Sequence, residues 1–291
     1  MNSSSTMKFF HTKGADFRAI FIDMAPSMNE AIKKISLHPY LTFHFGENVV
    51  SALLVAGLHR QAYGEVFHLN SKRYFDPMIV ESRGNGVWRG SAKTQPALAK
   101  IQEVSDINAD LAEAFLHVTR FDSSGKILAK GSIQSQGTSI PDLYAWYLLQ
   151  SEQVHTHLQV SLQLKDREGG IDIDKAYGLL VEALPGVSEN KQFILSDNLS
   201  RINNLRKYFE TGEKDNLDLL DDIYPGEQWI QSDEVQIRYE CGCSVEYYTA
   251  KIAALPAEQI NEIMNGSDQT VECGFCDQKY LIRYADLKNE L

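Results

Sequence analysis

The stretches YECGCSVEYY (239–248) and VECGFCDQKY (271–280) decide how this sequence is interpreted, because together they hold every cysteine of a 291-residue chain. The cysteines form a CxC pair and a CxxC pair with 29 residues between the pairs: Cys241, Cys243, Cys273 and Cys276. All of them lie in the last fifth of the sequence. This clustering predicts a small C-terminal unit that is organised by its cysteines.

The spacing within each pair suits a metal ion. The CxC pair follows an expected strand at 235–239, so both thiols can point to the same side of the extended chain, and Gly242 between them removes steric obstruction. The CxxC pair has the spacing of a metal knuckle, in which the small Gly274 lets the backbone fold around an ion. Four thiolates in two pairs predict a tetrahedral zinc site with Zn–S distances of about 2.3 Å. Two local disulfides, or an iron site with the same sulfur ligands, are the alternatives.

A zinc ion held by four protein ligands has no open coordination position, so we expect a structural role for the metal. Residues 235–291 are too few to build a sufficient core alone, and zinc binding contributes on the order of 10 kcal/mol or more to the folding of such a unit. Thiolates are also the form of cysteine that oxidants attack. Oxidation of either pair to a disulfide removes two ligands, which makes the same cysteines candidate redox sensors.

Composition places the chain among soluble globular proteins. Hydrophobic residues make up 43% and charged residues 23%, and the formal net charge of −11 works against binding a polyanion such as DNA. The N-terminus, MNSSSTMKFF, leads into no apolar stretch of signal-peptide length, and the apolar run 49–58 has about half of the ~20 residues that cross a bilayer. We therefore expect a cytoplasmic protein that contacts no membrane. In a reducing cytosol, clustered cysteines are more often metal ligands or redox-active thiols than permanent disulfides.

Residues 1–185 predict an α+β core domain. Expected strands are rich in apolar and β-branched residues: 17–22, 78–82 and 158–164. Ser27 and Glu30 match a capping box at the start of a short helix, and a buried helix is expected from 47 to 63 with Gly64 as its terminator.

The second half of this domain adds a hairpin and a helix. Residues 116–133 predict two strands joined by a turn at Gly125, and 140–150 predict a helix entered through Pro141. The order of elements contains no regular βαβ repeat, which favours α+β over a doubly wound sheet.

Residues 186–234 differ from the core because they are heavily charged yet carry apolar residues at helical spacing. These residues predict one helix face and then a second: Leu199, Ile202, Leu205 and Phe209, followed by Leu217, Leu220 and Ile223. Helices of this length are marginal alone in water, so the stripe needs a surface to cover it. The segment is either a solvated helical linker or a metastable linker that docks and melts, and it leads into the zinc-binding domain at 235–291.

The C-terminal cysteine spacing resembles the zinc centre of the heat shock protein 33 family, the redox-regulated holdase chaperones. Further stretches similar to the family lie in the zinc unit and in the core: LPAEQINEIM (255–264), CGFCDQKYLI (273–282), SEQ (151–153), Arg89 and Gly90 in VWRGSA, and LLVEALPG (179–186). The resemblance covers nearly the whole chain, and the cysteine spacing is its most specific element.

The resemblance implies a mechanism as well as a three-part architecture. In family members the reduced, zinc-bound protein is a poor chaperone. Oxidation would join Cys241 to Cys243 and Cys273 to Cys276, release zinc and unfold the linker. The protein would then bind unfolding client proteins without ATP, form a homodimer, and pass its clients to ATP-dependent foldase chaperones.

Two other classes of function compete with this interpretation. A zinc-ribbon nucleic-acid-binding module is disfavoured because residues 235–291 carry five Lys or Arg against nine Asp or Glu, so phosphate attraction is absent. A thiol-disulfide oxidoreductase would use Cys273 and Cys276, but such CxxC pairs usually sit in a thioredoxin-like βαβ setting that the sequence lacks.

Several smaller motifs have ordinary structural explanations. The glycines of RGNGVWRG (83–90) do not fit a dinucleotide loop and predict a hairpin turn at Asn85 and Gly86. His155 and His157 alternate along a strand without a further ligand, and LDLLDD (217–222) lacks the spacing of a calcium loop. We find no catalytic constellation and expect a protein that is not an enzyme.

Overall fold

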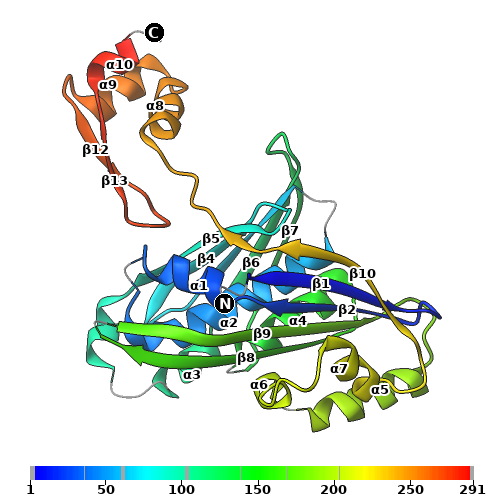
Figure 1. The fold of residues 1–291 in the computed structure, drawn as a ribbon. Coiled ribbons are helices and arrows are strands. Elements are labelled where there is room, and N and C mark those ends of the chain that lie inside the picture. The colour runs from blue at the N-terminus through cyan, green and yellow to red at the C-terminus, as the bar shows by residue number, and fades with distance from the viewer. Residues whose placement is uncertain are drawn as a thin grey trace.

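A computed structural model describes residues 4–35, 37–59, 63–101, 105–137, 139–168, 170–202 and 204–288. Two large β-sheets with helices between them form the core, short helices cover the outer face of one sheet, and a small unit at the C-terminal end stands out from the core (Figure 1). This mixed architecture confirms the predicted α+β class.

The first sheet has five strands, each antiparallel to its neighbour. In spatial order they are β10 (Trp229–Gln236), β1 (Thr6–Thr12), β2 (Phe17–Asp23), β9 (Gly170–Ala183) and β8 (Thr156–Arg167). Two of the predicted strands, 17–22 and 158–164, are confirmed within β2 and β8.

The second sheet has six strands, antiparallel except for the edge pair β11 and β5. In spatial order they are β11 (Arg238–Tyr239), β5 (Val87–Thr94), β4 (Phe75–Ser82), β3 (Gly64–Asn70), β6 (Phe115–Phe121) and β7 (Ile127–Gln134). The predicted hairpin at 116–133 is confirmed by β6 and β7. The predicted turn at Asn85 and Gly86 joins β4 to β5, and both residues have positive φ.

Helices fill the space between the sheets. They are α1 (Ala25–Ile32), α2 (Pro39–Leu58) and α4 (Ile140–Tyr147). Helix α3 (Ser105–Leu111), a 3-10 turn at Pro96–Lys100 and a π turn at Leu148–Glu152 add buried residues to the same apolar core. Helix α2 contacts strands of both sheets and α4. The helix predicted from 140 is confirmed, and Pro141 lies in its first turn.

The capping box predicted at Ser27 and Glu30 is wrong. Helix α1 begins at Ala25, two residues before Ser27, and has no side-chain cap. The Ser27 hydroxyl is buried and accepts a hydrogen bond of 2.8 Å from the indole N–H of Trp88 in the second sheet. Tertiary packing thus uses the hydroxyl that the local sequence pattern assigned to a helix end.

The extent predicted for α2 is also wrong. The helix runs from Pro39 to Leu58, so it starts eight residues before the predicted 47, and Gly64 opens β3 instead of ending a helix. The end of the prediction partly falls on 60–62, outside the described residues. With 20 residues, α2 is long and apolar enough to cross a membrane, but 83% of its apolar window is buried inside the protein. It is the buried core helix that the run 49–58 predicted.

Side chains of the five-stranded sheet alternate between two apolar clusters. On β2, Ile20 and Ile22 pack on the side of α2, whereas Phe17 and Phe21 pack on the opposite side. The period of two residues along a strand produces this division. The sheet is therefore covered on both faces.

The cover on the second face comes from the linker segment. It forms α5 (Glu189–Arg201), α6 (Leu205–Tyr208) and α7 (Asn216–Ile223), beside the sheet in Figure 1. The single helix face predicted from Leu199 to Phe209 is wrong, because helix α5 ends at Arg201 and α6 begins at Leu205. The amphipathic character is confirmed: the buried residues of these helices face the sheet, namely Leu195, Leu199, Leu205, Leu219, Leu220 and Ile223. The place predicted for Leu217 on the second face is wrong, because Leu217 is exposed and Leu219 is buried instead.

Strand β10 joins the linker to the C-terminal unit. It begins at Trp229, which is buried in the cluster under the linker helices, and it runs along β1 as the edge of the first sheet. It therefore crosses positions 234 and 235, between which the sequence placed the linker boundary. The C-terminal unit contains α8 (Val245–Ala253), α9 (Ala257–Met264), β12 (Gln269–Glu272), β13 (Lys279–Ile282) and α10 (Tyr284–Lys288) around a small apolar cluster of its own.

Candidate metal centre

The two cysteine pairs come from two separate segments. Cys241 and Cys243 lie between β11 and α8, while Cys273 and Cys276 lie in the turn that joins β12 to β13. That turn is closed by backbone hydrogen bonds from Cys273 to Gln278 and from Asp277 to Cys273. The pairing of β12 with β13 thus presents the CxxC pair to the CxC segment.

All four sulfur atoms lie within 4.8 Å of one another. Cys241 Sγ lies 3.4 Å from Cys273 Sγ, and Cys243 Sγ lies 3.4 Å from Cys276 Sγ. Sulfurs at 2.3 Å from a tetrahedral ion are about 3.8 Å apart. The structure therefore brings together every predicted site residue in an arrangement that fits a four-thiolate metal site, and all four cysteines are free thiols.

The two glycines assigned to this centre behave differently. Gly242 has φ +68°, and a Cβ there would lie 2.8 Å from an Arg83 side-chain nitrogen, so the position requires glycine. At Gly274 a Cβ would meet nothing within 4 Å, and its φ is not in the left-handed region. The role predicted for Gly274 is therefore wrong. Asp277, with φ 56°, takes the left-handed conformation in this turn.

Two tyrosines surround the sulfurs. The Tyr280 hydroxyl lies 3.1 Å from Cys243 Sγ and donates to the Cys243 carbonyl at 3.1 Å. Burial raises the pKa of Cys273, but hydrogen bonds from the Tyr248 hydroxyl and from the amides of Phe275 and Cys276 outweigh it and lower that pKa to about 6. Cys273 is thus the thiol that the protein itself favours as a thiolate.

The surroundings of Cys241 and Cys276 favour the protonated form of these two thiols. Burial, followed by hydrogen bonding to neighbouring cysteines, raises the pKa of Cys241 well above its ordinary value. Burial also raises the pKa of Cys276 to about 11. Several thiolates in so small a volume repel one another, so a bound cation is the group that would stabilise them together.

Sequence reasoning missed the charged residues that face this centre from the core. Arg89 donates to the Cys241 carbonyl at 3.1 Å and Arg83 donates to it at 3.4 Å. Glu81 holds both guanidinium groups, and the Arg89 Cζ lies 4.0 Å from the centre of the Phe275 ring. No local pattern links residues about 150 positions apart. The contact exists because β11 pairs with β5 directly before the cysteines.

The histidines and the CxxC setting support no competing site. His155 and His157 are exposed and belong to no group of three or more metal-binding side chains among the described residues. The CxxC pair lies in an antiparallel hairpin, not between a parallel strand and a helix as in thioredoxin-like enzymes.

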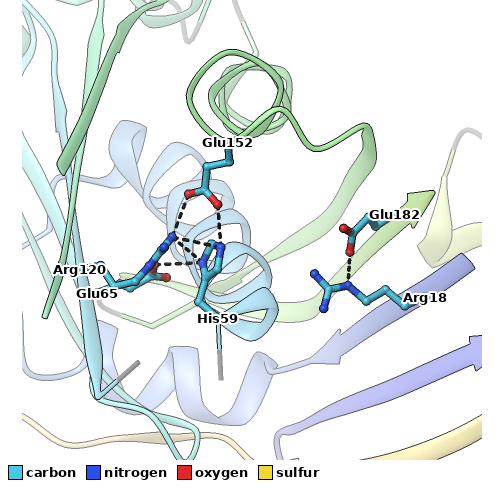
Figure 2. Close-up of polar contacts among 6 residues, drawn as sticks. All are labelled: Arg18, His59, Glu65, Arg120, Glu152 and Glu182. Carbon is cyan, nitrogen blue, oxygen red and sulfur yellow. Dashed lines mark hydrogen bonds and ion pairs between the residues drawn. The ribbon is translucent and has the colours of Figure 1, made fainter. Parts of the chain in front are cut away.

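A second charged cluster that the sequence did not reveal lies at the C-terminal end of α2 (Figure 2). His59 contacts Glu65 at 3.0 Å and Glu152 at 2.7 Å, and Arg120 pairs with both carboxylates. Burial lowers the pKa of His59, but the two carboxylates outweigh burial and raise it to about 9. With the ring protonated, the cluster contains two cations and two anions.

Together, the fold and the cysteine centre define an α+β protein with a C-terminal unit whose four clustered thiols fit a metal ion. The sequence model of the Hsp33 protein family matches residues 5–283. The chain therefore belongs to the Hsp33 family.

Named relatives agree with this assignment. The 33 kDa chaperonin of Lactococcus lactis subsp. cremoris (strain SK11) is 23% identical over 281 residues, which cover 95% of this chain and 96% of the relative. The 33 kDa chaperonin of Thermoanaerobacter sp. (strain X514) is 30% identical over 164 residues, or 55% of this chain and 54% of the relative. The crystal structure of the 33 kDa chaperonin (heat shock protein 33 homolog) from Thermotoga maritima matches with a TM-score of 0.80 at 18% identity, covering 99% of this chain and 98% of that chain. The chain is thus a member of a chaperone family with the fold of that structure.

Proposed function

We propose that this chain is a redox-regulated, ATP-independent holdase chaperone of the cytoplasm. In this proposal the reduced, zinc-bound form is inactive. Oxidation of the cysteines releases zinc, the linker helices leave the sheet, and the uncovered apolar face binds unfolding client proteins. The oxidised protein forms a homodimer and passes clients to ATP-dependent foldase chaperones.

The observation that carries the proposal is the route of the chain from the cysteines to the linker. Cys241 follows β11 and β10, and the other end of β10 is Trp229, which packs in the same apolar cluster as the linker helices. Bound zinc would cross-link the two cysteine segments and so support the fold of the small C-terminal unit. Loss of that unit would remove the support at the end of β11, the short strand through which the exposed edge strand β10 continues to Cys241.

The surface under the linker is suited to holding unfolded protein. The residues of the five-stranded sheet that the linker covers are large and apolar: Phe10, Phe17, Phe21, Leu179 and Val181. A contiguous apolar surface of this kind binds exposed hydrophobic segments without directional requirements. The client site would therefore be the second face of the five-stranded sheet.

The redox step balances within the cysteine centre and the oxidant. With hydrogen peroxide, Cys273 and Cys276 lose two electrons and form one S–S bond, while peroxide takes up those electrons and two protons and becomes two water molecules. Cys241 and Cys243 react in the same way with a second peroxide. Because all four sulfurs lie within 4.8 Å, pairing across the segments is the competing outcome, and peptide mapping without reduction would distinguish the two patterns.

Light scattering from a thermally unfolding client enzyme tests the function. The chain is added either reduced and zinc-loaded or oxidised with peroxide at mild heat. We expect only the oxidised form to suppress aggregation. Equal suppression by both forms would contradict redox control and leave a constitutive chaperone, and no suppression by either would contradict the chaperone function.

A matched variant assigns the effect to the cysteines. In the variant Cys273→Ser/Cys276→Ser, peroxide should change neither client holding nor metal content. A variant that responds to peroxide as the parent does would contradict the role of this pair.

A further inference from the structure

Arg89 and Arg83 occupy a place in the structure that the metal centre alone does not explain. Both extend from the β4–β5 hairpin of the core to the carbonyl oxygen of Cys241, a proposed ligand residue. The Arg89 side chain is only 12% exposed. Burying a guanidinium is costly unless its hydrogen bonds are satisfied, so its position here is strongly specified.

One carboxylate, that of Glu81, holds both arginine side chains in place. Glu81 accepts from Arg83 Nε at 2.7 Å through one oxygen and from Arg89 Nη2 at 2.6 Å and Nε at 2.9 Å through the other. The three side chains together carry one net positive charge, which faces the cysteine segment. Arg89 also stacks on Phe275, one of the two residues between the cysteines of the CxxC pair.

Arg89 therefore contacts both cysteine segments at once. It reaches the CxC segment through the Cys241 carbonyl and the CxxC segment through the Phe275 ring. A backbone hydrogen bond fixes the CxC segment against strand β5 at the same place. The Glu240 N–H, directly before Cys241, donates to the carbonyl of Trp88, directly before Arg89, at 2.9 Å. Gly242 has a positive φ that favours glycine, and a Cβ there would lie 2.8 Å from an Arg83 side-chain nitrogen, so Arg83 packs closely on this backbone.

We propose that Arg89, assisted by Arg83, is a positioning residue of the metal centre that holds the two cysteine segments in register and offsets the charge of the thiolates. The inference rests on the proposed binding of zinc by the cysteines. Four thiolates with one divalent cation carry a net charge of −2, which a nearby fixed cation stabilises. The positive charge of Arg89 also lowers the electron density at the sulfurs. Because this makes the thiolates weaker nucleophiles, Arg89 slows their attack on peroxide.

The test compares Arg89→Gln with Lys93→Gln in the full-length chain. Lys93 is exposed near the end of β5 opposite to the residues that pair with β11, so K93Q removes the same charge from the same strand away from the cysteine segment. Zinc affinity is measured by competition with a chromophoric chelator, and zinc release is followed after addition of peroxide. We expect R89Q to bind zinc roughly 10- to 100-fold more weakly and to release it faster, with K93Q equal to the parent.

Two further readouts separate charge compensation from simple docking. In the cobalt(II)-loaded protein, R89Q should shift the thiolate-to-metal charge-transfer band to lower energy, and R89K should restore most of the parent band. Parent-like affinity, release rate and spectrum in R89Q would overturn the inference. If R89Q does not fold, the same measurements are made on Arg83→Gln. We expect smaller changes in zinc affinity and release rate in the same directions, and parent-like values would overturn the inference. A parent that binds no zinc contradicts the proposed function instead.

Discussion

Both faces of the five-stranded sheet are apolar, but they are covered in different ways. Helix α2 covers one face with 20 residues, most of them buried, and lies so close that a Cβ on Gly178 would be 2.4 Å from a Val50 methyl carbon. The other face is covered by three short helices. Helix α5 buries only Leu195 and Leu199 of its 13 residues, and its Phe193 is 70% exposed.

This difference indicates that the linker helices α5–α7 can leave the sheet more easily than helix α2 can. A short polar helix gains little stability from its own backbone and depends on packing of one narrow stripe, whereas α2 is packed on all sides. We therefore expect local opening to start at the linker and to leave the α2 face intact. The same strands thereby serve a permanent core on one side and the proposed client surface on the other.

The largest effect is expected from removing the support of the C-terminal unit. In C273S/C276S, zinc binding is lost, and with it on the order of 10 kcal/mol of folding free energy for that unit. Hydrogen exchange should then show lost protection in residues 245–288 and in the linker helices, with α2 still protected. Loss of protection in α2 as well would break the distinction between the two faces.

The next effect in size is expected at the centre of the α2 face. Leu54 is fully buried, so Leu54→Ala should lower the free energy of unfolding by about 2 to 5 kcal/mol. Urea denaturation would report this as a lower midpoint for the core transition. A midpoint equal to that of the parent would show that α2 is not the permanent cover.

A smaller and local effect is expected on the linker face. Leu220 is 1% exposed in α7, and Leu220→Ala should cost about 2 kcal/mol, the lower end for such a change, because a short helix can readjust. Exchange should accelerate in α5–α7 only, and the reduced protein should suppress client aggregation in part. Exchange that accelerates equally across α2 would contradict a separate linker unit.

The smallest effect is expected from titration of the cluster in Figure 2. The pKa of His59 is raised from about 6.5 to about 9 on folding, so the stabilisation is fully present below pH 6.5 and is lost as the pH rises through 9. A pKa difference of this size corresponds to about 3 kcal/mol for a fully buried group. Solvent screening of the partly exposed ring reduces it, so we expect a loss of about 1 to 2 kcal/mol across this pH range. His59→Gln should flatten the pH profile of the unfolding free energy, and an unchanged profile would contradict the protonated ring. Because His59 follows α2, the loss should weaken the permanent face and leave linker exchange unaltered.

Much of the core could be predicted from short-range patterns. The apolar and β-branched residues of 17–22 and the turn residues at 85, 86 and 125 specify strands and hairpins through properties of neighbouring residues. The helix ends predicted from sequence were wrong where tertiary contacts use the residues that the local pattern assigned to a helix end. Ser27 is used by Trp88, 61 positions away, and Gly64 lies in a sheet.

The sequence by itself predicted a four-thiol metal site, because CxC and CxxC spacings each place two thiols close enough to bind one ion. It also determined that the linker needs a covering surface. Only the tertiary structure decided that this surface is the second face of the five-stranded sheet, and that Arg83 and Arg89 reach the cysteine segment from the core. Such contacts join residues more than 150 positions apart, and chain folding, not local preference, brings them together.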